Sequence, residues 1–480
     1  MAHAHGFGQR YDLPLPLPLW VGGAGVSILL SFVVAAVFLR KPGQVPTVVD
    51  RDLLDLPFVR QLGSAPVVAA LRTVSVGLWL LAIAAGLYGQ QDAYTNIAPT
   101  LVWIVGWVGL SFASIFFGDV WATLHPLATV FSWIEKAVRR GTGRSLTLGR
   151  TWPAALGVWP AVALFAVFAW LELVWSASDV PYELGRVLAL YSGVTLFGMF
   201  VFGRDRWLAC GELFYVAFGV LARFSVFQLR PTSETSPRAW RLRPPGVGLL
   251  EGLPLSVSQM VFVTLMLATV TFDGLLETRQ WLAVADRLSI AGWMQPVLST
   301  LRDFGFSDDE ILGSIGFAAV PLVFLSLLAL TARVTRSLVK GRGGALPESV
   351  PSSSEIARTL VATLVPIAIA YHLAHYLSML VVSGQYLIPL ISDPFGFGWN
   401  LWGTADYRVD IGILGVRFVW YSAAFAIVSG HVVAVVLAHV LALRDFGTRR
   451  AALWSQVPSL VLMVGYTMLS LWTLAQPIVE

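Results

Sequence analysis

Long apolar runs separated by short polar loops dominate the hydrophobic pattern of this chain. Each run holds close to the roughly 20 apolar residues that an α-helix needs to cross a bilayer. We therefore expect ten membrane-spanning helices, bounded by charged residues and by Pro or Gly breaks. The predicted fold class is all-α, a polytopic transmembrane helix bundle that forms one integral membrane domain over residues 1–480. The predicted spans lie near residues 19–39, 66–88, 98–117, 153–175, 186–202, 254–276, 313–333, 359–383, 416–442 and 455–475.

Two further stretches are apolar or amphipathic but are not expected to cross the membrane. Residues 204–223, "RDRWLACGELFYVAFGVLAR", carry Arg at both ends, so both flanks should lie on the same side. Such a segment lies in the interface or re-enters the membrane. Residues 118–140 predict an amphipathic helix on the cytoplasmic surface. Pro160, Pro321 and Pro366 fall within predicted spans and are expected to kink them.

Lys and Arg collect in alternate loops, and this asymmetry orients the predicted bundle. The basic loops follow the first, third, fifth, seventh and ninth spans. In the intervening loops, including 277–312 and 384–412, acidic residues match or outnumber basic ones. Because basic loops stay in the cytoplasm, both termini are predicted on the non-cytoplasmic side.

Composition narrows the functional classes. Charged residues make up 12% of the chain and hydrophobic residues 56%, so the lipid bilayer is the expected partner. The formal charge of +4 comes from the basic loops, and we expect no nucleic-acid partner. Cys210 is the only cysteine, which excludes an internal disulfide and a CxxC motif. The first residues lack a basic region followed by an apolar core, so no cleavable signal peptide is expected.

Histidines inside apolar runs carry the most specific chemistry of the sequence. The stretch "AYHLAHYLSML" places His372 and His375 three residues apart, on nearly one face of the eighth span. At about 1.5 Å of rise per residue, they lie roughly 16 and 12 Å from its outer end. His431 on the ninth span lies roughly 20 Å deep and His439 roughly 33 Å deep, at the inner interface. The first three are expected to meet at a common level, and His439 is not.

Three converging imidazoles predict a metal site. They form the ligand set of a catalytic zinc that keeps its fourth position open. Met379, four residues after His375, would shift the preference towards copper. We therefore predict that His372, His375 and His431 bind a divalent metal, either zinc or copper. The alternative is that each histidine only forms hydrogen bonds across a helix interface, with Met379 packing in the core.

Acidic residues near the outer ends of two spans are candidates for supporting roles. Asp273 and Glu277 lie at the end of the sixth span, and Glu172 lies near the end of the fourth. We predict that Asp273 and Glu172 act as catalytic residues, either as a general base or as partners that orient a metal ligand. The alternative is that these acids only face headgroups or loops. Glu212 in the 204–223 segment is a weaker candidate.

The outer loop "DPFGFGWNLWGTADYRVD", residues 393–410, is rich in glycine and aromatic residues. Long loops of this composition often bind ligands, so it is a candidate lid over the outer mouth of the site. The alternative is a capping loop that Trp399 and Trp402 anchor at the membrane interface.

Four stretches carry a family resemblance. "GQRYDLPLPLPLW", "GDVWATLHPL", "YHLAHYLSML" and "SDPFGFGWNLWGTADY" together resemble the bacterial integral membrane proteins known as fenitrothion hydrolases. The resemblance covers essentially the full chain. It implies a bacterial plasma membrane location and hydrolysis of the aryl P–O bond of an organophosphorus triester. The implied substrate is a small apolar molecule that reaches the site through the bilayer or the outer mouth, and a metal-bound hydroxide is the implied nucleophile.

Three functions remain open at this point. The first is a metal-dependent membrane hydrolase acting on phosphotriesters. The second is a metal-ion or small-solute transporter, in which the same histidines bind a passing ion. The third is a non-catalytic membrane scaffold with histidines that only pack. Turnover in detergent separates the first from the second, because a transporter needs a sealed vesicle.

Overall fold

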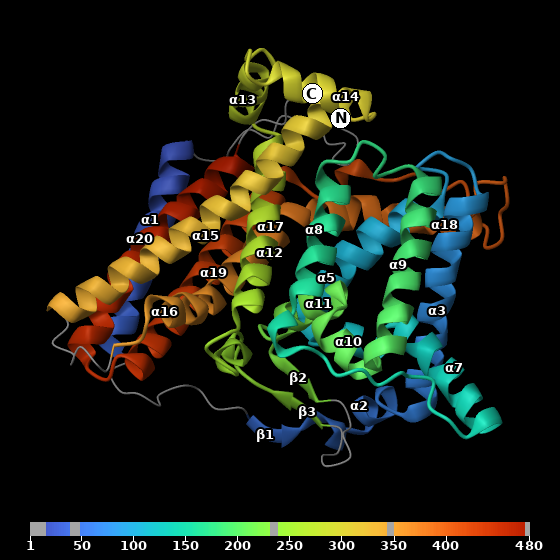
Figure 1. The fold of residues 1–480 in the computed structure, drawn as a ribbon, viewed down its shortest axis with the longest axis horizontal. Coiled ribbons are helices and arrows are strands. Elements are labelled where there is room, and N and C mark those ends of the chain that lie inside the picture. Colours follow the sequence, from blue (N-terminus) through green and yellow to red (C-terminus); the bar gives the residue numbers. More distant parts are fainter. Residues whose placement is uncertain (1–15, 39–48, 231–238, 343–349, 476–480) are drawn as a thin grey trace.

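The computed structural model describes residues 16–38, 49–230, 239–342 and 350–475 (Figure 1). Within these residues, ten helical segments are long and apolar enough to cross a membrane. This confirms the predicted all-α polytopic bundle. The segments are α1 (Leu17–Phe38), α3 (Ala65–Tyr88), the run Ile97–Phe117, α8 (Trp159–Leu173), α9 (Pro181–Phe202), α12 (Val257–Leu276), α15 (Asp308–Arg342), α17 (Val365–Val382), α19 (Val416–Asp445) and α20 (Arg449–Leu474).

Several of these segments include irregular turns. The run Ile97–Phe117 consists of α4 (Ile97–Pro99), a π-helical stretch η2 (Thr100–Gly109) and α5 (Leu110–Phe117). Before α17 come α16 (Ser353–Leu360) and η6 (Val361–Leu364), and after it come η7 (Ser383–Tyr386) and α18 (Leu387–Ser392). Among the other short helices are η1 (Leu53–Asp55), α2 (Pro57–Leu62), η3 (Ala154–Leu156), η4 (Val247–Leu250) and η8 (Ile411–Ile413).

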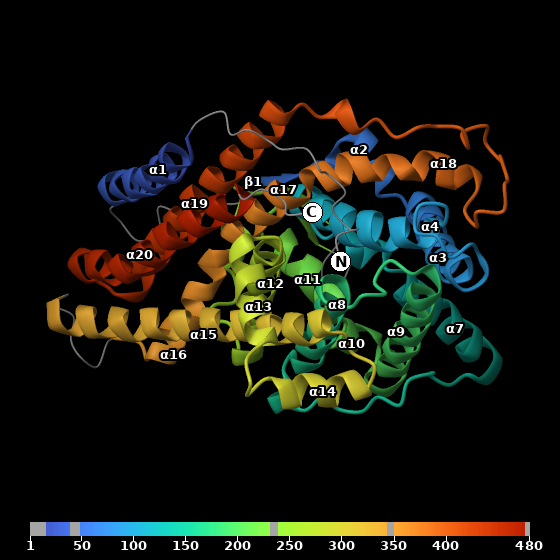
Figure 2. The same cartoon turned by 90° about the horizontal axis from the view of Figure 1, so that it is seen from above.

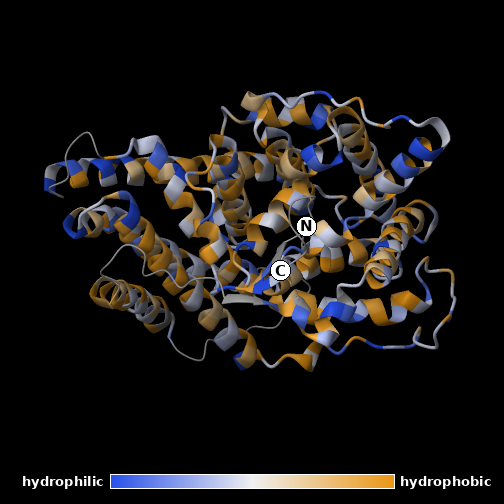
Figure 3. Ribbon diagram, turned by 90° about the horizontal axis from the view of Figure 1, so that it is seen from below, coloured by the Kyte–Doolittle hydropathy of each residue, from blue (hydrophilic) through white to orange (hydrophobic). Residues whose placement is uncertain are grey.

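Apolar side chains cover much of the outer surface of the bundle. Leu30 on α1, Leu322 on α15 and Phe425 on α19 are all exposed. Figure 3 shows hydrophobic residues along the long helices and hydrophilic ones mainly at helix ends and in loops. Exposed apolar surface on this scale indicates a lipid environment, since water-soluble proteins rarely expose large contiguous apolar patches. The chain is a multi-pass membrane protein by the length and composition of its helices.

Helices α12 and α17 lie at the centre of the bundle. From above, they separate a group containing α8, α9 and α11 (Leu213–Ala222) from one containing α15, α19 and α20 (Figure 2). Helix α12 packs against α8, α15 and α17, and α17 packs along α19. Ser256 and Gln259 form a capping box that starts α12, because each side chain bonds the backbone amide of the other. Residues of α12 and α17 are therefore placed to meet in the interior.

The three prolines occupy different positions in their helices. Pro321 lies inside α15, and Pro366 follows the 3-10 turn η6 within the helical run Ser353–Ser392. Pro160 lies in the first turn of α8, where a proline removes an amide that has no partner within the helix. The kinks stay a prediction.

A small antiparallel sheet joins loops that were predicted only as basic connections. It contains β1 (Val49–Asp52), β2 (Phe227–Arg230) and β3 (Ala239–Leu242), in the order β1-β3-β2. The strands have four residues each and lie between charged residues, so hydrophobic alternation does not reveal them. In Figure 1 the sheet lies at one end of the bundle, and α13 (Arg279–Ser289) and α14 (Gln295–Asp303) lie at the other.

The two segments not expected to span the membrane form pairs of short helices. Residues 204–223 hold α10 (Arg204–Cys210) and α11, and α11 packs inside the bundle against α5 and α8. This agrees with the re-entrant alternative. Residues 118–140 hold α6 (Val120–Leu124) and most of α7 (Pro126–Thr142). The start of α7 is buried and its end is exposed, so it is only partly a surface helix.

Candidate functional site

A carboxylate, an imidazole and a phenol meet in the interior between α12 and α17. His375 Nε2 lies 2.9 Å from Asp273 Oδ2, and the exposed fractions of the two side chains are 10% and 6%. The Tyr376 hydroxyl donates a hydrogen bond of 2.6 Å to the same Asp273 oxygen. We call Asp273, His375 and Tyr376 the acid–base cluster. Its members are close enough to exchange protons directly.

Further charged and aromatic groups surround the acid–base cluster. Glu172 lies within electrostatic range of the Tyr376 hydroxyl, and Glu277 within range of Tyr371. The rings of Tyr371 and His375 stack with their centroids 5.9 Å apart. Of the predicted catalytic positions, Asp273 lies beside the predicted metal ligand His375, and Glu172 lies within electrostatic range of Tyr376. Their catalytic roles stay predictions.

His372 lies in an aromatic environment, with its ring centroid 4.7 Å from that of Tyr376. Its ring meets Trp107 edge-on at a centroid distance of 5.7 Å and lies 6.0 Å from Phe112. These residues belong to η2 and α5. The His372 Nε2 atom is buried and has no hydrogen-bond partner among the described residues.

His431 lies at about the same height in the bundle as the histidines of α17, as predicted. Its ring, however, faces a different helix, α20. The adjacent Gly430 packs against Ala370 and Pro366 of α17, so the two helices align as expected. The His431 Nδ1–H donates a bond of 2.7 Å to the Ile427 carbonyl, and the ring lies 6.3 Å from that of Tyr466 on α20. Its Nε2 is buried and has no hydrogen-bond partner among the described residues.

The three predicted metal ligands therefore contact different neighbours. His372 faces Trp107, His375 faces Asp273, and His431 faces Tyr466. Among the described residues, no group of three His, Cys, Asp or Glu side chains is arranged to hold a metal ion. This arrangement does not fit the three-histidine site. The divalent metal, zinc or copper, stays a prediction, and none of the steps proposed below involves a metal.

Sequence reasoning missed the tyrosines of this region. Tyr376 completes the acid–base cluster, and the Tyr371 hydroxyl lies 3.0 Å from the Thr473 hydroxyl on α20. The available signal was that both tyrosines flank histidines in a predicted span. A buried phenol usually finds a hydrogen-bond partner, so each tyrosine pointed to a polar neighbour on another helix.

A second buried polar group lies near the sheet end of the bundle. His125, predicted at the surface, is instead buried, with Nε2 3.5 Å from Glu212 Oε2. Each of these side chains also caps a helix, since His125 Nδ1 accepts from Ala128 and Glu212 accepts from Tyr215. Tyr191 donates a hydrogen bond to Glu212 as well. These hydrogen bonds give the buried His125–Glu212 pair a structural role, because they connect α7, α9 and α11.

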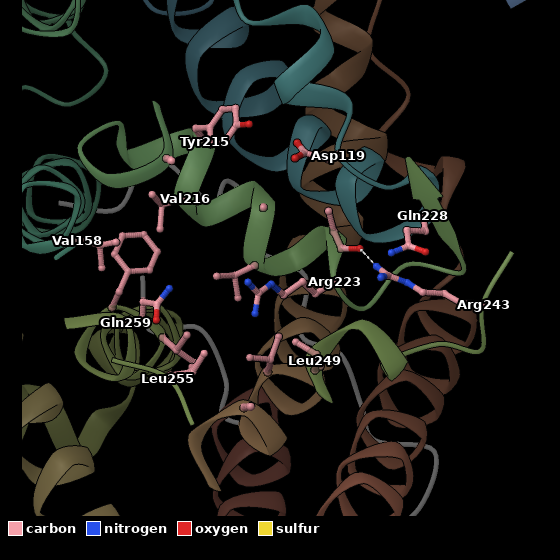
Figure 4. Close-up of a pocket in the computed structure, with 18 of the residues that line it drawn as sticks. Asp119, Val158, Tyr215, Val216, Arg223, Gln228, Arg243, Leu249, Leu255 and Gln259 are labelled. Atoms are coloured by element: carbon pink, nitrogen blue, oxygen red, sulfur yellow. Dashed lines mark hydrogen bonds between the residues drawn. The ribbon is translucent and has the colours of Figure 1, made fainter. Parts of the chain in front are cut away.

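A cavity of about 340 Å³ opens beside this pair (Figure 4). Its walls are mostly apolar, and its charged members are Asp119, Arg223 and Arg243. Burial lowers the pKa of the Arg243 guanidinium, which donates to the backbone carbonyls of Ser225 and Ala222. Burial also raises the pKa of Asp119, against the opposing effects of the Ala122 amide and His125. Arg243 thus serves to hold the chain around the cavity.

The 393–410 loop is bonded to the turn before α4 and to η7. The backbone N–H of Gln90 donates to the Phe395 carbonyl, and the backbone N–H of Ile97 donates to the Pro394 carbonyl. Within the loop, Asp393 accepts from the amides of Phe397 and Gly398. The loop therefore covers the ends of α3 and α4, and its role as a lid stays a prediction.

No family model, curated protein or solved structure matches this chain.

Proposed function

We propose that this protein is a membrane-embedded hydrolase whose reaction depends on proton transfer by Asp273, His375 and Tyr376. The observation that carries the proposal is the 2.9 Å contact between His375 and Asp273 inside the bundle. Ionisable side chains are costly within a membrane and typically mark sites or pathways. A carboxylate beside an imidazole fixes the orientation of the ring and stabilises its protonated form.

The cluster suits general acid–base catalysis. His375 takes a proton from a water molecule as that water attacks the substrate, and Asp273 balances the positive charge on the ring. The proton then passes to the leaving group. Tyr376 holds the same carboxylate oxygen and so fixes its position. Glu172 adds negative charge near the Tyr376 hydroxyl.

The substrate class that we propose is an apolar phosphotriester with an aryl leaving group. The resemblance to fenitrothion hydrolases supports it, and so does a site enclosed by membrane helices, since such a molecule partitions into lipid. We also propose that the protein lies in a bacterial plasma membrane with the sheet end in the cytoplasm. In Figure 1 the sheet lies opposite α13 and α14, and by this orientation both chain termini are non-cytoplasmic.

A transporter of protons or small solutes is the second candidate. The observation that favours it is the burial of the Asp273 and His375 side chains among the helices. Buried Asp and His side chains form proton relays in membrane transporters. The two candidates differ in what they need. Hydrolysis proceeds in detergent, whereas transport is measurable only across a sealed membrane.

The test is release of nitrophenol from a nitrophenyl phosphotriester by the full-length protein in detergent. We expect turnover by the wild type and a loss of about 100-fold or more in kcat/KM for Asp273→Asn and His375→Gln, as is typical when an acid–base group is removed. Glu183→Gln is the matched control, because this carboxylate pairs with Arg186 outside the cluster. Absence of turnover in the wild type, or equal rates in all variants, would overturn the proposal.

A further inference from the structure

A line of buried polar side chains runs along one face of α20. Its members are spaced three, four or seven residues apart, so they lie on one side of the helix. All of them are buried, although the segment is long and apolar enough to span a membrane. We call this line the polar seam; its residues are Gln456, Ser459, Tyr466, Ser470 and Thr473.

The polar seam starts at a cavity near the inner ends of the helices. This cavity, about 350 Å³ in volume, lies between α15, α16, α19 and α20. Hydroxyl and amide groups from four elements line it, including Thr335, Thr363 and Ser459. Gln456 also lines it and lies 2.9 Å from His439 Nδ1. The cavity therefore offers the hydrogen-bonding walls that water needs.

Beyond the cavity, the polar seam continues to the acid–base cluster through bonds between helices. Tyr466 and Thr271 of α12 join through their hydroxyls at 2.7 Å. Farther along α20, Thr473 joins Tyr371, whose ring stacks on His375. Gln456 and Thr473 are separated by roughly 26 Å at the rise of an α-helix, which is close to the thickness of a bilayer core.

One buried atom beside the polar seam lacks a hydrogen-bond partner. His431 Nε2 has none among the described residues and is nearly inaccessible, and the buried Ser470 hydroxyl lies beside that of Tyr466. The His431 ring lies 6.3 Å from that of Tyr466, and Ser470 lies one helical turn beyond Tyr466. Orphaned polar atoms of this kind are rare in protein interiors, where ordered water normally satisfies them.

We propose that the polar seam is a water path from the inner cavity to the acid–base cluster. Water enters beside Thr363 and Ser459, bonds His431 Nε2 and Ser470 Oγ, and reaches His375 through Tyr371. This assigns His431 a role in binding water. The purpose of the path, supply of the attacking water, rests on the proposed hydrolase function, whereas its existence does not.

Radiolytic hydroxyl-radical footprinting of the full-length protein in detergent tests the path, because radicals form from water next to the labelled side chain. Met463 lies on the same face of α20, between Ser459 and Tyr466, and Met199 lies on α9, away from the polar seam. Both are buried and each packs in an apolar cluster, so they differ in their distance from the proposed path. We expect Met463 to oxidise at least tenfold faster than Met199. Equal rates for the two methionines would overturn the proposal.

Variants that plug the inner cavity provide the second arm. Ser459→Leu and Thr363→Leu each place an apolar side chain at its wall and should reduce oxidation of Met463 several-fold. Ser326→Leu, on the exposed face of α15, is the matched control and should change nothing. Unchanged labelling in both plugged variants would contradict the path. No substrate is used, so a failure of hydrolysis and a failure of the water path are distinguishable.

Discussion

Gly430 of α19 packs directly on Pro366 of α17: a β-carbon added at Gly430 would lie 2.6 Å from the Pro366 carbonyl oxygen. Because backbone cannot move as easily as a side chain, no residue other than glycine fits without shifting one helix. This contact fixes how closely the two histidine-bearing helices approach. It also sets the position of His431, the next residue along α19, against the central helix.

We therefore expect Gly430→Ala to destabilise the protein by about 1–3 kcal/mol, the usual cost of overpacking an interior contact. Thermal unfolding in detergent measures the effect. Gly465→Ala on α20 is the matched control, because a β-carbon there meets nothing within 4 Å. That variant should be neutral or slightly stabilising, since alanine favours helix. Equal loss of stability in both variants would show that the helices do not meet at Gly430.

Asp119, which lines the 340 Å³ cavity near His125 and Glu212, is expected to make stability depend on pH. Burial raises the pKa of its carboxyl, so ionisation is less favourable in the folded state than in the unfolded state. Its contribution to stability is therefore fully present below the unfolded pKa and is lost as pH rises through the folded pKa. Asp119→Asn keeps a capping side chain for the Ala122 amide without the charge.

The expected result is that Asp119→Asn melts higher than the wild type at neutral pH, with a gap that closes as the pH falls towards 4. Melting temperatures over a pH series measure this gap. Asp286→Asn on α13, outside the cavity, serves as the control. A gap that stays constant across the series would contradict a raised pKa at Asp119.

Elemental analysis addresses the metal prediction directly. His431 faces Tyr466 rather than His372 or His375, so His431→Ala should leave any bound metal at the wild-type ratio. The measurement compares zinc and copper per chain in the purified wild type and in the variant. Loss of stoichiometric metal from His431→Ala would show that the three imidazoles converge, and would restore the metal-dependent mechanism.

Hydrophobic run length was enough to predict the spans, because crossing a bilayer constrains a helix more strongly than any tertiary contact. The acids Asp273 and Glu172 were also predicted, since charges near the ends of spans stand out. The grouping of the histidines could not be predicted in the same way. His372 and His375 lie on nearly one face of α17, yet they contact different helices. Which neighbour each ring meets depends on the rotation of every helix, and helix packing sets that rotation.

The burial of His125 was missed for a related reason. It lies in the amphipathic stretch 118–140, which ends in Lys136, Arg139 and Arg140, so the pattern indicates a surface position. In the structure, Glu212 meets it in the interior. The small sheet was missed because β1 pairs with β3, a segment about 190 residues away in the chain. Short strands of four residues carry too little alternation to be recognised. Long-range pairing of this kind is visible only in the folded chain.

The central claim is that Asp273 and His375 act as one unit, and a double-mutant cycle tests it most directly. The measurement is kcat/KM for nitrophenyl phosphotriester hydrolysis by the wild type, Asp273→Asn, His375→Gln and the double variant. If the carboxylate acts through the imidazole, the double variant loses no more activity than the worse single variant. Losses that multiply across the two substitutions would mean that the residues act independently and would contradict the account.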